Sequence, residues 1–251
     1  MGSGCTKPSF VGTRTVDATL KDTFCCKTNM KLVFALPGRE FSGRFLTAWT
    51  ETFTTLMREG HQVMMVNEYS SFVSFSRMKT LGLDVLRGKD QKPFNGTLDY
   101  DLWITIDSDI VFKPQQVLEL IENSKEHPVV SGLYRMADLQ HFACVQVWDE
   151  DYFKKHGSFK FLRPEDIVGA PKFKQVAYNG MGFMAVRKDV LDAMTYPYFS
   201  YPLQTMTTED GTVLEDMCSE DVAFCKNLKD AGYDVMVNTQ LVVGHEKMLV
   251  I

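Results

Sequence analysis

Residues 102–112, LWITIDSDIVF, contain the strand that decides the fold predicted for this chain. Five mostly apolar residues lead directly into Asp107, Ser108 and Asp109, and the chain becomes apolar again at Ile110. An apolar run of this length is typical of a buried strand in a parallel sheet. Parallel sheets bind ligands at the carboxyl ends of their strands. Two carboxylates at such an end therefore indicate a binding site.

The residues before this strand predict alternating strands and helices. The expected elements are a strand at 31–36 that Pro37 and Gly38 end, a helix at 44–59, a buried strand at 61–69, a helix at 70–81 and a loop at 87–99. A strand, a helix and a second strand within about forty residues indicate a parallel sheet with crossover helices.

The residues after the central strand continue this pattern less regularly. The expected elements are a helix at 114–124, a strand at 127–134, a glycine-interrupted strand followed by a helix at 178–194, a helix at 219–232 and a pair of strands at 233–243. Residues 1–29 are polar and interrupted by Gly, Pro and Thr. We therefore expect a polar N-terminal extension there and one α/β domain over residues 30–251.

The composition is that of an ordinary globular protein. The 251 residues are 45% hydrophobic and 24% charged, with a formal net charge of −5. A phosphate-neutralising surface needs an excess of basic residues, so we expect no nucleic-acid partner. Neither a long apolar run nor a signal-like N-terminus is present, so we expect no transmembrane segment and no export. The six cysteines have no CxxC spacing, which favours reduced thiols in a cytoplasmic protein.

Asp107 and Asp109 are expected to act as a pair. In an extended segment, alternation points both side chains to one side of the strand and Ser108 to the other. Two carboxylates at this spacing repel each other unless a cation or water lies between them. Hard oxygen ligands suit Mg²⁺ or Mn²⁺, which completes its shell with phosphate oxygens. A metal-bound diphosphate is one interpretation, and a solvated turn in which Asp109 caps the next helix is the other.

Three further motifs carry residues typical of a site, and each also has an ordinary structural explanation. Glu220 and Asp221 follow Ser219 at the start of a helix, where the helix dipole favours negative charge, and such a motif often serves only as a helix cap. His245 follows an apolar strand, and a lone histidine there is more often structural. The glycines of residues 178–183, YNGMGF, let a backbone approach a ligand closely or form a plain bulge.

The order and spacing of these motifs resemble nucleotide-sugar-dependent glycosyltransferases of the GT-A fold, in particular DxD-containing, family-2-like members. The matching features are a strand with a proline loop, hydrophobic-DSD, NGMGF, SED before VAFCKNLKDAGYDV and a strand that ends in GH, within residues 31–247. The resemblance implies an α/β fold with a mostly parallel central sheet, flanking helices and a smaller irregular β region. It also implies transfer of a sugar from a nucleoside-diphosphate sugar to an acceptor hydroxyl.

The resemblance implies a role for each matching acidic residue and for the histidine. Asp107 and Asp109 would hold Mn²⁺ or Mg²⁺ together with the donor diphosphate or ribose, and His245 would be the third metal ligand. Asp221 would be the general base for the acceptor hydroxyl, and Glu220 would bind the acceptor or tune that base. The acceptor would be a glycan, a lipid-linked sugar, a protein or a small metabolite.

Donor binding is implied for a second set of residues. These are Pro37 and Arg39 in the loop after the first strand, Arg77, Ser108 between the two aspartates, and Gly180, Met181 and Gly182 at the border of the sugar. Aromatic residues of the irregular half are candidates for stacking on sugar faces. They are Trp148, Tyr152, Tyr196, Tyr198, Phe199 and Tyr201.

One segment departs from the family pattern. Residues 195–217 align with no part of it, and long loops of this kind often determine specificity. Four acidic residues in this segment can compete with Asp221 for the role of general base: Glu209, Asp210, Glu215 and Asp216. Retaining enzymes of this fold place carboxylates and histidine similarly, so inversion and retention both stay open.

Other classes of protein stay open as well. ITIDSDIV also fits haloacid-dehalogenase-like phosphotransferases, in which Asp107 would be the nucleophile. Two strands and two helices precede the motif here, whereas it normally opens the first strand of its domain. A nucleotidyltransferase would need a Gly-rich basic loop after the first strand, and LPGREFSGRF has only two widely spaced glycines. A catalytically silent nucleotide-sugar-binding protein is the non-enzymatic alternative.

Overall fold

The computed structural model describes residues 29–248, so the predicted N-terminal extension lies outside the described residues apart from Asn29. The longer strands are β1 (Lys31–Pro37), β2 (Gln62–Glu68), β3 (Leu102–Ile106), β5 (Val129–Leu133), β7 (Phe173–Val176), β9 (Phe183–Arg187) and β12 (Val235–Val242). They form one sheet in the order β2-β1-β3-β9-β5-β12-β7. β2, β1, β3, β5 and β12 run in one direction, because β9 pairs antiparallel with both β3 and β5. The predicted α/β class with a mostly parallel sheet is confirmed.

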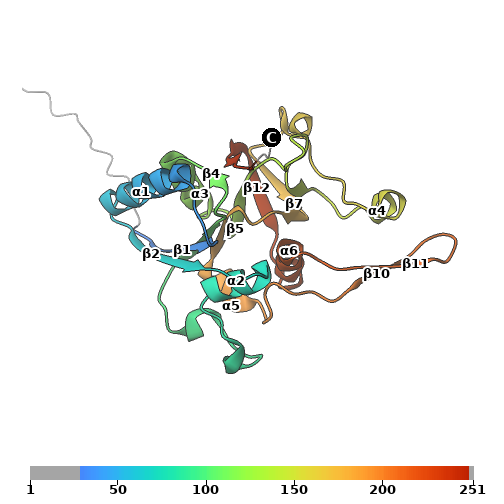
Figure 1. The fold of residues 1–251 in the computed structure, drawn as a ribbon, viewed down its shortest axis with the longest axis horizontal. Coiled ribbons are helices and arrows are strands. Elements are labelled where there is room, and N and C mark those ends of the chain that lie inside the picture. The colour runs from blue at the N-terminus through green and yellow to red at the C-terminus, as the bar shows by residue number, and fades with distance from the viewer. Residues whose placement is uncertain (1–28, 249–251) are drawn as a thin grey trace, which may run out of the picture.

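Helices cover both faces of the sheet (Figure 1). They are α1 (Gly43–Arg58), α2 (Val73–Thr80), α3 (Pro114–Asn123), α4 (Glu150–His156), α5 (Lys188–Ala193) and α6 (Glu220–Asp230). α1 and α3 contact each other and pack on one face, whereas α2, α5 and α6 lie against the other. Within residues 29–248, no helix has the length and apolar character needed to cross a membrane.

The side chains of β1 explain why its sequence is a continuous apolar run. Leu32, Phe34 and Leu36 point into the core cluster under α1 and α3. Val33 and Ala35 point into the cluster on the opposite face. A strand that is buried on both faces has no polar position in its alternation. The same rule explains LWITI in β3, where all five residues are buried.

Two predictions about strands are wrong. β2 was expected to be buried, but it is the edge strand of the sheet, and its Met64 and Met65 are 43% and 51% exposed. An edge strand has a neighbour on one side only and is covered less completely. Residues 233–243 were expected to form two strands, but they contain the single strand β12.

Short strands form three small additional sheets. They are β4 (Ile110–Val111) with β13 (Gly244–His245), β6 (Cys144–Val145) with β8 (Tyr178–Asn179), and β10 (Gln204–Thr207) with β11 (Val213–Asp216). The hairpin of β10 and β11 extends away from the body of the protein (Figure 1). The chain before it also contains three 3₁₀ helices, Val85–Arg87, Pro93–Gly96 and Pro164–Ile167. The second lies within the loop predicted at 87–99, and the first ends at the first residue of that loop.

The strand directions bring the predicted motifs to one edge of the sheet. β1 ends at Pro37 and β3 ends at Ile106, where Asp107 follows. β9 runs the opposite way, so its first residue, Phe183, pairs with Ile106 and places NGMG at the same edge. β12 runs parallel to β5, and its carboxyl end leads to His245. Ligands of open α/β sheets bind at this kind of edge.

Candidate functional site

Asp107, Ser108 and Asp109 lie in a turn between β3 and β4. The Ile110 amide donates to the Asp107 carbonyl across 3.0 Å, which closes a four-residue turn. The expectation that extended alternation points both aspartates to the same side is therefore wrong. A turn separates the two side chains and gives each its own partners. The Asp107 amide donates to the Gly182 carbonyl at 3.0 Å, which joins this turn to the glycine motif.

Asp107 is held by a buried arginine. Arg77, on α2, is 3% exposed and donates from Nη1 and Nη2 to the two Asp107 carboxylate oxygens at 2.9 and 3.0 Å. Its Nε donates to Glu220 Oε1 at 3.3 Å. Burial by itself lowers the pKa of Arg77, but the adjacent Asp107 and Glu220 carboxylates raise it above its ordinary value. The guanidinium is a permanent positive charge between two acidic residues.

Asp109 meets His245 because β4 pairs with β13. His245 stands opposite Ile110 in this antiparallel pair, directly beside Asp109. Asp109 Oδ2 lies 3.2 Å from His245 Nε2 and 2.6 Å from Lys247 Nζ. Burial acts to raise the pKa of Asp109, but hydrogen bonds from His245 and Lys247 lower it to about 2. This carboxylate is negatively charged at neutral pH.

The tautomer of His245 is set by the backbone. Nδ1 lies 2.6 Å from the carbonyl oxygen of Arg135, and a carbonyl can only accept, so Nδ1 carries a proton. Nε2 faces Asp109 Oδ2 and donates to that oxygen only when it carries a proton too; in the neutral ring with the proton on Nδ1, Nε2 instead presents a lone pair that a metal can bind. An imidazole whose other nitrogen donates to a carbonyl is the usual arrangement of a metal-binding histidine.

Two of the three predicted metal ligands lie in contact, and the third is engaged elsewhere. Within residues 29–248, no group of three or more His, Cys, Asp or Glu side chains is arranged to hold a metal ion. Asp109 and His245 supply one oxygen and one nitrogen donor, a pair that suits Mn²⁺ or Mg²⁺ with further oxygen ligands from a substrate. Asp107 faces Arg77 instead. Of the three predicted ligands, the structure therefore brings only Asp109 and His245 together, and Lys247 Nζ lies 2.6 Å from the same Asp109 oxygen.

The start of α6 presents Asp221 in a fixed orientation. Its Oδ1 accepts from Ser219 Oγ at 2.5 Å and from the Val222 amide at 2.8 Å, and its Oδ2 accepts from the Tyr178 hydroxyl at 2.8 Å. Burial, followed by the neighbouring Asp221 charge, raises the pKa of Tyr178, so this hydroxyl stays protonated and donates. Burial raises the pKa of Glu220, an effect that Asp221 strengthens and Arg77 opposes.

The glycine motif packs against Tyr134. A Cβ at Gly180 would lie 2.1 Å from the Tyr134 hydroxyl, and one at Gly182 would lie 2.9 Å from its ring. The Gly182 amide donates to this hydroxyl at 3.3 Å. Met181 is fully buried in the core, so its side chain contributes packing. The glycines are needed here to admit a tyrosine ring, and the border with a donor sugar stays a prediction.

Replacing Gly180 by Ala is expected to destabilise the protein by about 1–3 kcal/mol, the usual cost of overpacking a core. The new methyl group would overlap the hydroxyl of Tyr134, a residue that is 8% exposed and has little room to move. Urea denaturation measures the loss. Gly43→Ala is the matched control, because a Cβ there has nothing within 4 Å and the residue begins α1. Equal stability of the two variants would contradict this account.

The loop after β1 lies against the aspartate turn. Gly38 has φ +155°, and a Cβ there would lie 2.7 Å from Ser108 Cβ. Asn67, near the end of β2, donates to the carbonyls of Leu36 and Gly38 at 2.7 and 2.9 Å. Pro37 is buried and Arg39 is exposed. Arg39 is therefore accessible to a ligand at this edge.

Several residues of the site were not found from the sequence. Tyr178 begins the quoted YNGMGF motif and Lys247 follows His245 by two residues, but no spacing rule assigns them to Asp221 and Asp109. Tyr134 and Arg135 follow β5 and carried no signal, because strand order decides which residues face them. Of the competing carboxylates, Glu209 and Asp210 lie in the turn of the extended hairpin, and Asp216 lies at its base.

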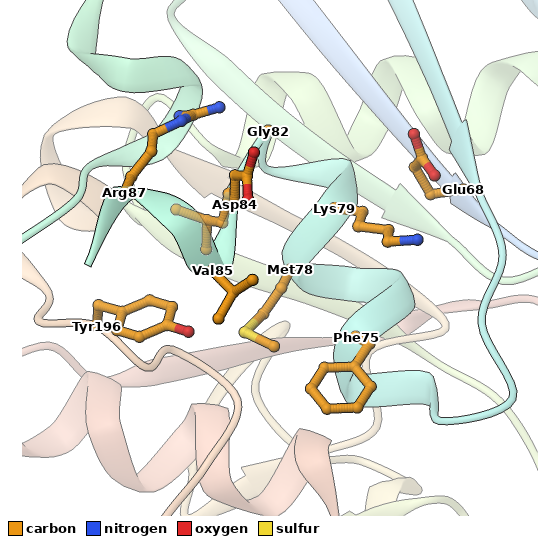
Figure 2. Close-up of a pocket in the computed structure, with 10 residues that line it drawn as sticks. Glu68, Phe75, Met78, Lys79, Gly82, Asp84, Val85, Arg87 and Tyr196 are labelled. Atoms are coloured by element: carbon orange, nitrogen blue, oxygen red, sulfur yellow. The ribbon is translucent and has the colours of Figure 1, made fainter. Parts of the chain in front are cut away.

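A cavity of about 660 Å³ lies beside α2, and its lining includes the stacking candidate Tyr196 but none of the predicted catalytic, donor-binding or metal-binding residues. Figure 2 shows Met78 and Val85 between Phe75 on one side and Tyr196 on the other. Arg77, on the same helix, instead contacts Asp107 at the sheet edge. The acidic, basic and histidine side chains of the candidate site therefore lie outside this cavity.

No family model and no curated protein matches the chain. Among solved structures, the chain is similar to A197 from STIV, with 14% identity, a TM-score of 0.47, and coverage of 88% of this chain and 97% of that one. It is similar to GalNAc-T7 with UDP, GalNAc and Mn²⁺, with 10% identity, a TM-score of 0.49 and 88% of this chain covered, and it spans only 44% of that chain.

A third similar structure is glucosyl-3-phosphoglycerate synthase from Mycobacterium tuberculosis in complex with Mn²⁺, uridine-diphosphate and phosphoglyceric acid. The identity is 13%, the TM-score is 0.44, and the match covers 89% of this chain and 73% of that chain. Similarity at these values carries no conclusion about the chemistry of this chain. The chemistry has to be inferred from its own residues.

Proposed function

We propose that this protein is a metal-dependent glycosyltransferase that moves a sugar from a nucleoside-diphosphate sugar to an acceptor hydroxyl. In this proposal, residues 30–251 form a single GT-A-like catalytic domain in the cytoplasm. The free thiols of Cys144, Cys218 and Cys225 are compatible with that location. The donor side is the edge formed by the β1 loop and the aspartate turn, and the acceptor side is the start of α6.

One observation carries the proposal. The Arg77 guanidinium bonds to Asp107 at the carboxyl end of β3 and to Glu220 at the start of α6. These two motifs are more than one hundred residues apart in the chain. A single side chain therefore holds the donor motif beside the residue that precedes the candidate base, as a transfer reaction between two substrates requires.

Asp221 is suited to act as the base. An acceptor hydroxyl is a poor nucleophile at neutral pH, and a positioned carboxylate removes its proton as the new C–O bond forms. Donors from Ser219, Val222 and Tyr178 hold the Asp221 carboxylate in one orientation. A fixed base does not need to be reoriented during the reaction, which favours catalysis.

Asp109 and His245 are the residues that would hold Mn²⁺ or Mg²⁺. A bound divalent cation would neutralise the negative charge that develops on the departing nucleoside diphosphate. Lys247, 2.6 Å from Asp109, adds a second positive charge for phosphate oxygens at the same place. Arg39, exposed in the loop after β1, can add a third.

Two alternatives receive less support from the site. A phosphotransferase would use Asp107 as the nucleophile, but both of its carboxylate oxygens are bonded to Arg77. A silent nucleotide-sugar-binding protein would need no oriented carboxylate at the acceptor side, yet Asp221 has three donors. A phospho-aspartyl intermediate that is lost in Asp107→Asn would establish the first alternative in place of ours.

Nucleoside diphosphates are expected to raise the melting temperature of the protein only when Mn²⁺ is present, because a ligand that binds the folded form stabilises it by mass action. UDP, GDP and ADP, each with Mn²⁺ or with EDTA, form the panel. In Asp109→Asn and His245→Ala, the affinity for Mn²⁺ should fall at least about 10–100-fold, as it does when metal sites lose supporting groups. Isothermal titration calorimetry measures this affinity.

His156→Ala is the control for a lost imidazole, since His156 ends α4 and is exposed. The proposed metal site is excluded if Asp109→Asn and His245→Ala bind Mn²⁺ as tightly as this control. The proposed function is excluded if no nucleoside diphosphate stabilises the protein in either condition.

A further inference from the structure

A second cavity, of about 190 Å³, lies where α4, the β10–β11 hairpin and α6 meet. Its lining combines the aromatic rings of Trp148, Phe153 and Phe159 with polar side chains that include Gln204, Asp216 and Lys226. Clefts for drug-sized ligands have roughly 300–1,000 Å³. This cavity is smaller and fits one ring-sized group.

The aromatic wall of the cavity is built from three contacting rings. Trp148 and Phe159 pack edge to face with centroids 5.1 Å apart, and Phe153 packs on Phe159 at 5.3 Å. Trp148 is only partly buried. Of the other aromatic candidates for sugar stacking, Tyr198 and Phe199 are buried in the core and are excluded as platforms.

The polar groups are arranged beside this wall. Lys226 lies 4.9 Å from the centre of the Trp148 ring and donates to Gln204 Oε1 at 2.6 Å, so the amide orientation of Gln204 is set. Within residues 29–248, the Asp216 carboxylate has no hydrogen-bonding partner and can accept from two hydroxyl groups. An apolar face with a few placed donors and acceptors is typical of a site for a small polar ligand.

Side-chain contacts link the wall of the cavity to the candidate base. The rings of Trp148 and Tyr178 lie 6.3 Å apart, and the Tyr178 hydroxyl bonds to Asp221 at 2.8 Å. Cys218, which also lines the cavity, is three residues before Asp221. A ring-sized group in the cavity would therefore lie on the acceptor side of the site.

We propose that this cavity binds one ring of a carbohydrate acceptor, with Trp148 as the stacking face and Asp216 as the hydroxyl acceptor. A pyranose ring has C–H groups on its face, which pack on an aromatic ring, and hydroxyl groups around its rim, which form hydrogen bonds. An aromatic wall beside hydroxyl-binding side chains matches both. Asp149, Glu150 and Asp216 outnumber the single cation Lys226 among the lining residues. Excess negative charge selects a neutral sugar over a uronic acid or a phosphosugar.

This inference deepens the proposed function by naming the acceptor as a carbohydrate, and its test is separate from donor binding. Methyl glycosides of glucose, galactose, mannose, N-acetylglucosamine and glucuronic acid are the probes. Saturation-transfer NMR on the full chain, without nucleotide, detects their binding. At least one neutral glycoside is expected to bind, and the glucuronide is expected not to bind.

Trp148→Leu and Asp216→Asn are expected to weaken that binding at least about tenfold, which corresponds to about 1.4 kcal/mol. Asparagine has the size of aspartate, and the Asp216 carboxylate has no hydrogen bond to lose within residues 29–248. Asp216→Asn should therefore fold and serves as the second variant if Trp148→Leu does not. Phe75→Leu is the matched aromatic control, because Phe75 is 50% exposed and lines the other cavity. Its binding should be that of the unmodified protein.

The inference is overturned if no neutral glycoside binds, if only the glucuronide binds, or if a folded Trp148→Leu or Asp216→Asn binds like the Phe75→Leu control. The nucleoside diphosphate panel gives an independent result. Glycoside binding at Trp148 without metal-dependent nucleotide binding would leave this cavity a carbohydrate site and would refute the glycosyltransferase. Metal-dependent nucleotide binding without glycoside binding would support the proposed function and would refute the carbohydrate site in this cavity.

Discussion

Asp221→Asn is expected to lower kcat for sugar transfer by about 10²–10⁴-fold, the contribution of a general base. The asparagine keeps the size of the side chain and one oxygen that can accept from Tyr178, but it cannot take the acceptor proton. Metal-dependent binding of the nucleoside diphosphate should be unchanged, because Asp109 and His245 are intact. Initial rates with the nucleotide sugar selected by the stabilisation panel measure kcat.

The control for this variant is Asp210→Asn. Asp210 lies in the turn of the β10–β11 hairpin and is exposed, so its activity should equal that of the unmodified protein. Glu220→Gln tests the neighbouring carboxylate, which bonds to Arg77. Full activity of Asp221→Asn together with a large loss in Glu220→Gln would transfer the role of base to Glu220.

Arg77→Met is expected to destabilise the protein by about 3 kcal/mol, near the lower end of the cost of breaking a buried ion pair. The variant leaves two carboxylates close together with no counter-charge. Their side chains are only 26% (Asp107) and 20% (Glu220) exposed, so water replaces the guanidinium incompletely. The lower end applies because some water does reach them. The melting temperature should fall by roughly 6–12 °C for a chain of this size.

Denaturation by urea measures this loss, and Arg39→Met is the matched control because Arg39 is exposed. A double-mutant cycle gives a sharper result. Asp107→Asn removes one of the two carboxylate charges that Arg77→Met leaves without a counter-charge. It should therefore lower the free energy of unfolding less in the Arg77→Met background than by itself. Equal costs in the two backgrounds would show that Arg77 and Asp107 do not stabilise each other.

Arg77 also shows how far a sequence can go in locating this site. The resemblance of the motifs to a family implied Arg77 as a donor-binding residue, and no pattern in the sequence alone singled it out. The sequence contains no sign that this cation would face Asp107 and Glu220, because that contact depends on how α2 and α6 pack on the sheet. The predicted metal triad was incomplete for the same reason, since Asp107 has Arg77 as its partner.

The sequence by itself determined the elements whose stability is local or depends on simple burial. The apolar runs of β1 and β3 and the helical periodicity of α1, α3 and α6 place these elements within a few residues of their predicted positions. A continuous apolar run, or a repeat every 3.6 residues, fits within a short window of sequence. The edge position of β2 was missed, because exposure depends on a neighbour that lies elsewhere in the chain.

Only the tertiary structure decided which motifs meet. His245 reaches Asp109 through the pairing of β13 with β4, and NGMG reaches Asp107 because β9 runs antiparallel to β3. Trp148 and Asp216 come together where two irregular segments dock on α6. Contacts of this kind in the site join residues up to 143 positions apart, as between Arg77 and Glu220. Their geometry follows from strand order, strand direction and packing, which no local pattern of residue types encodes.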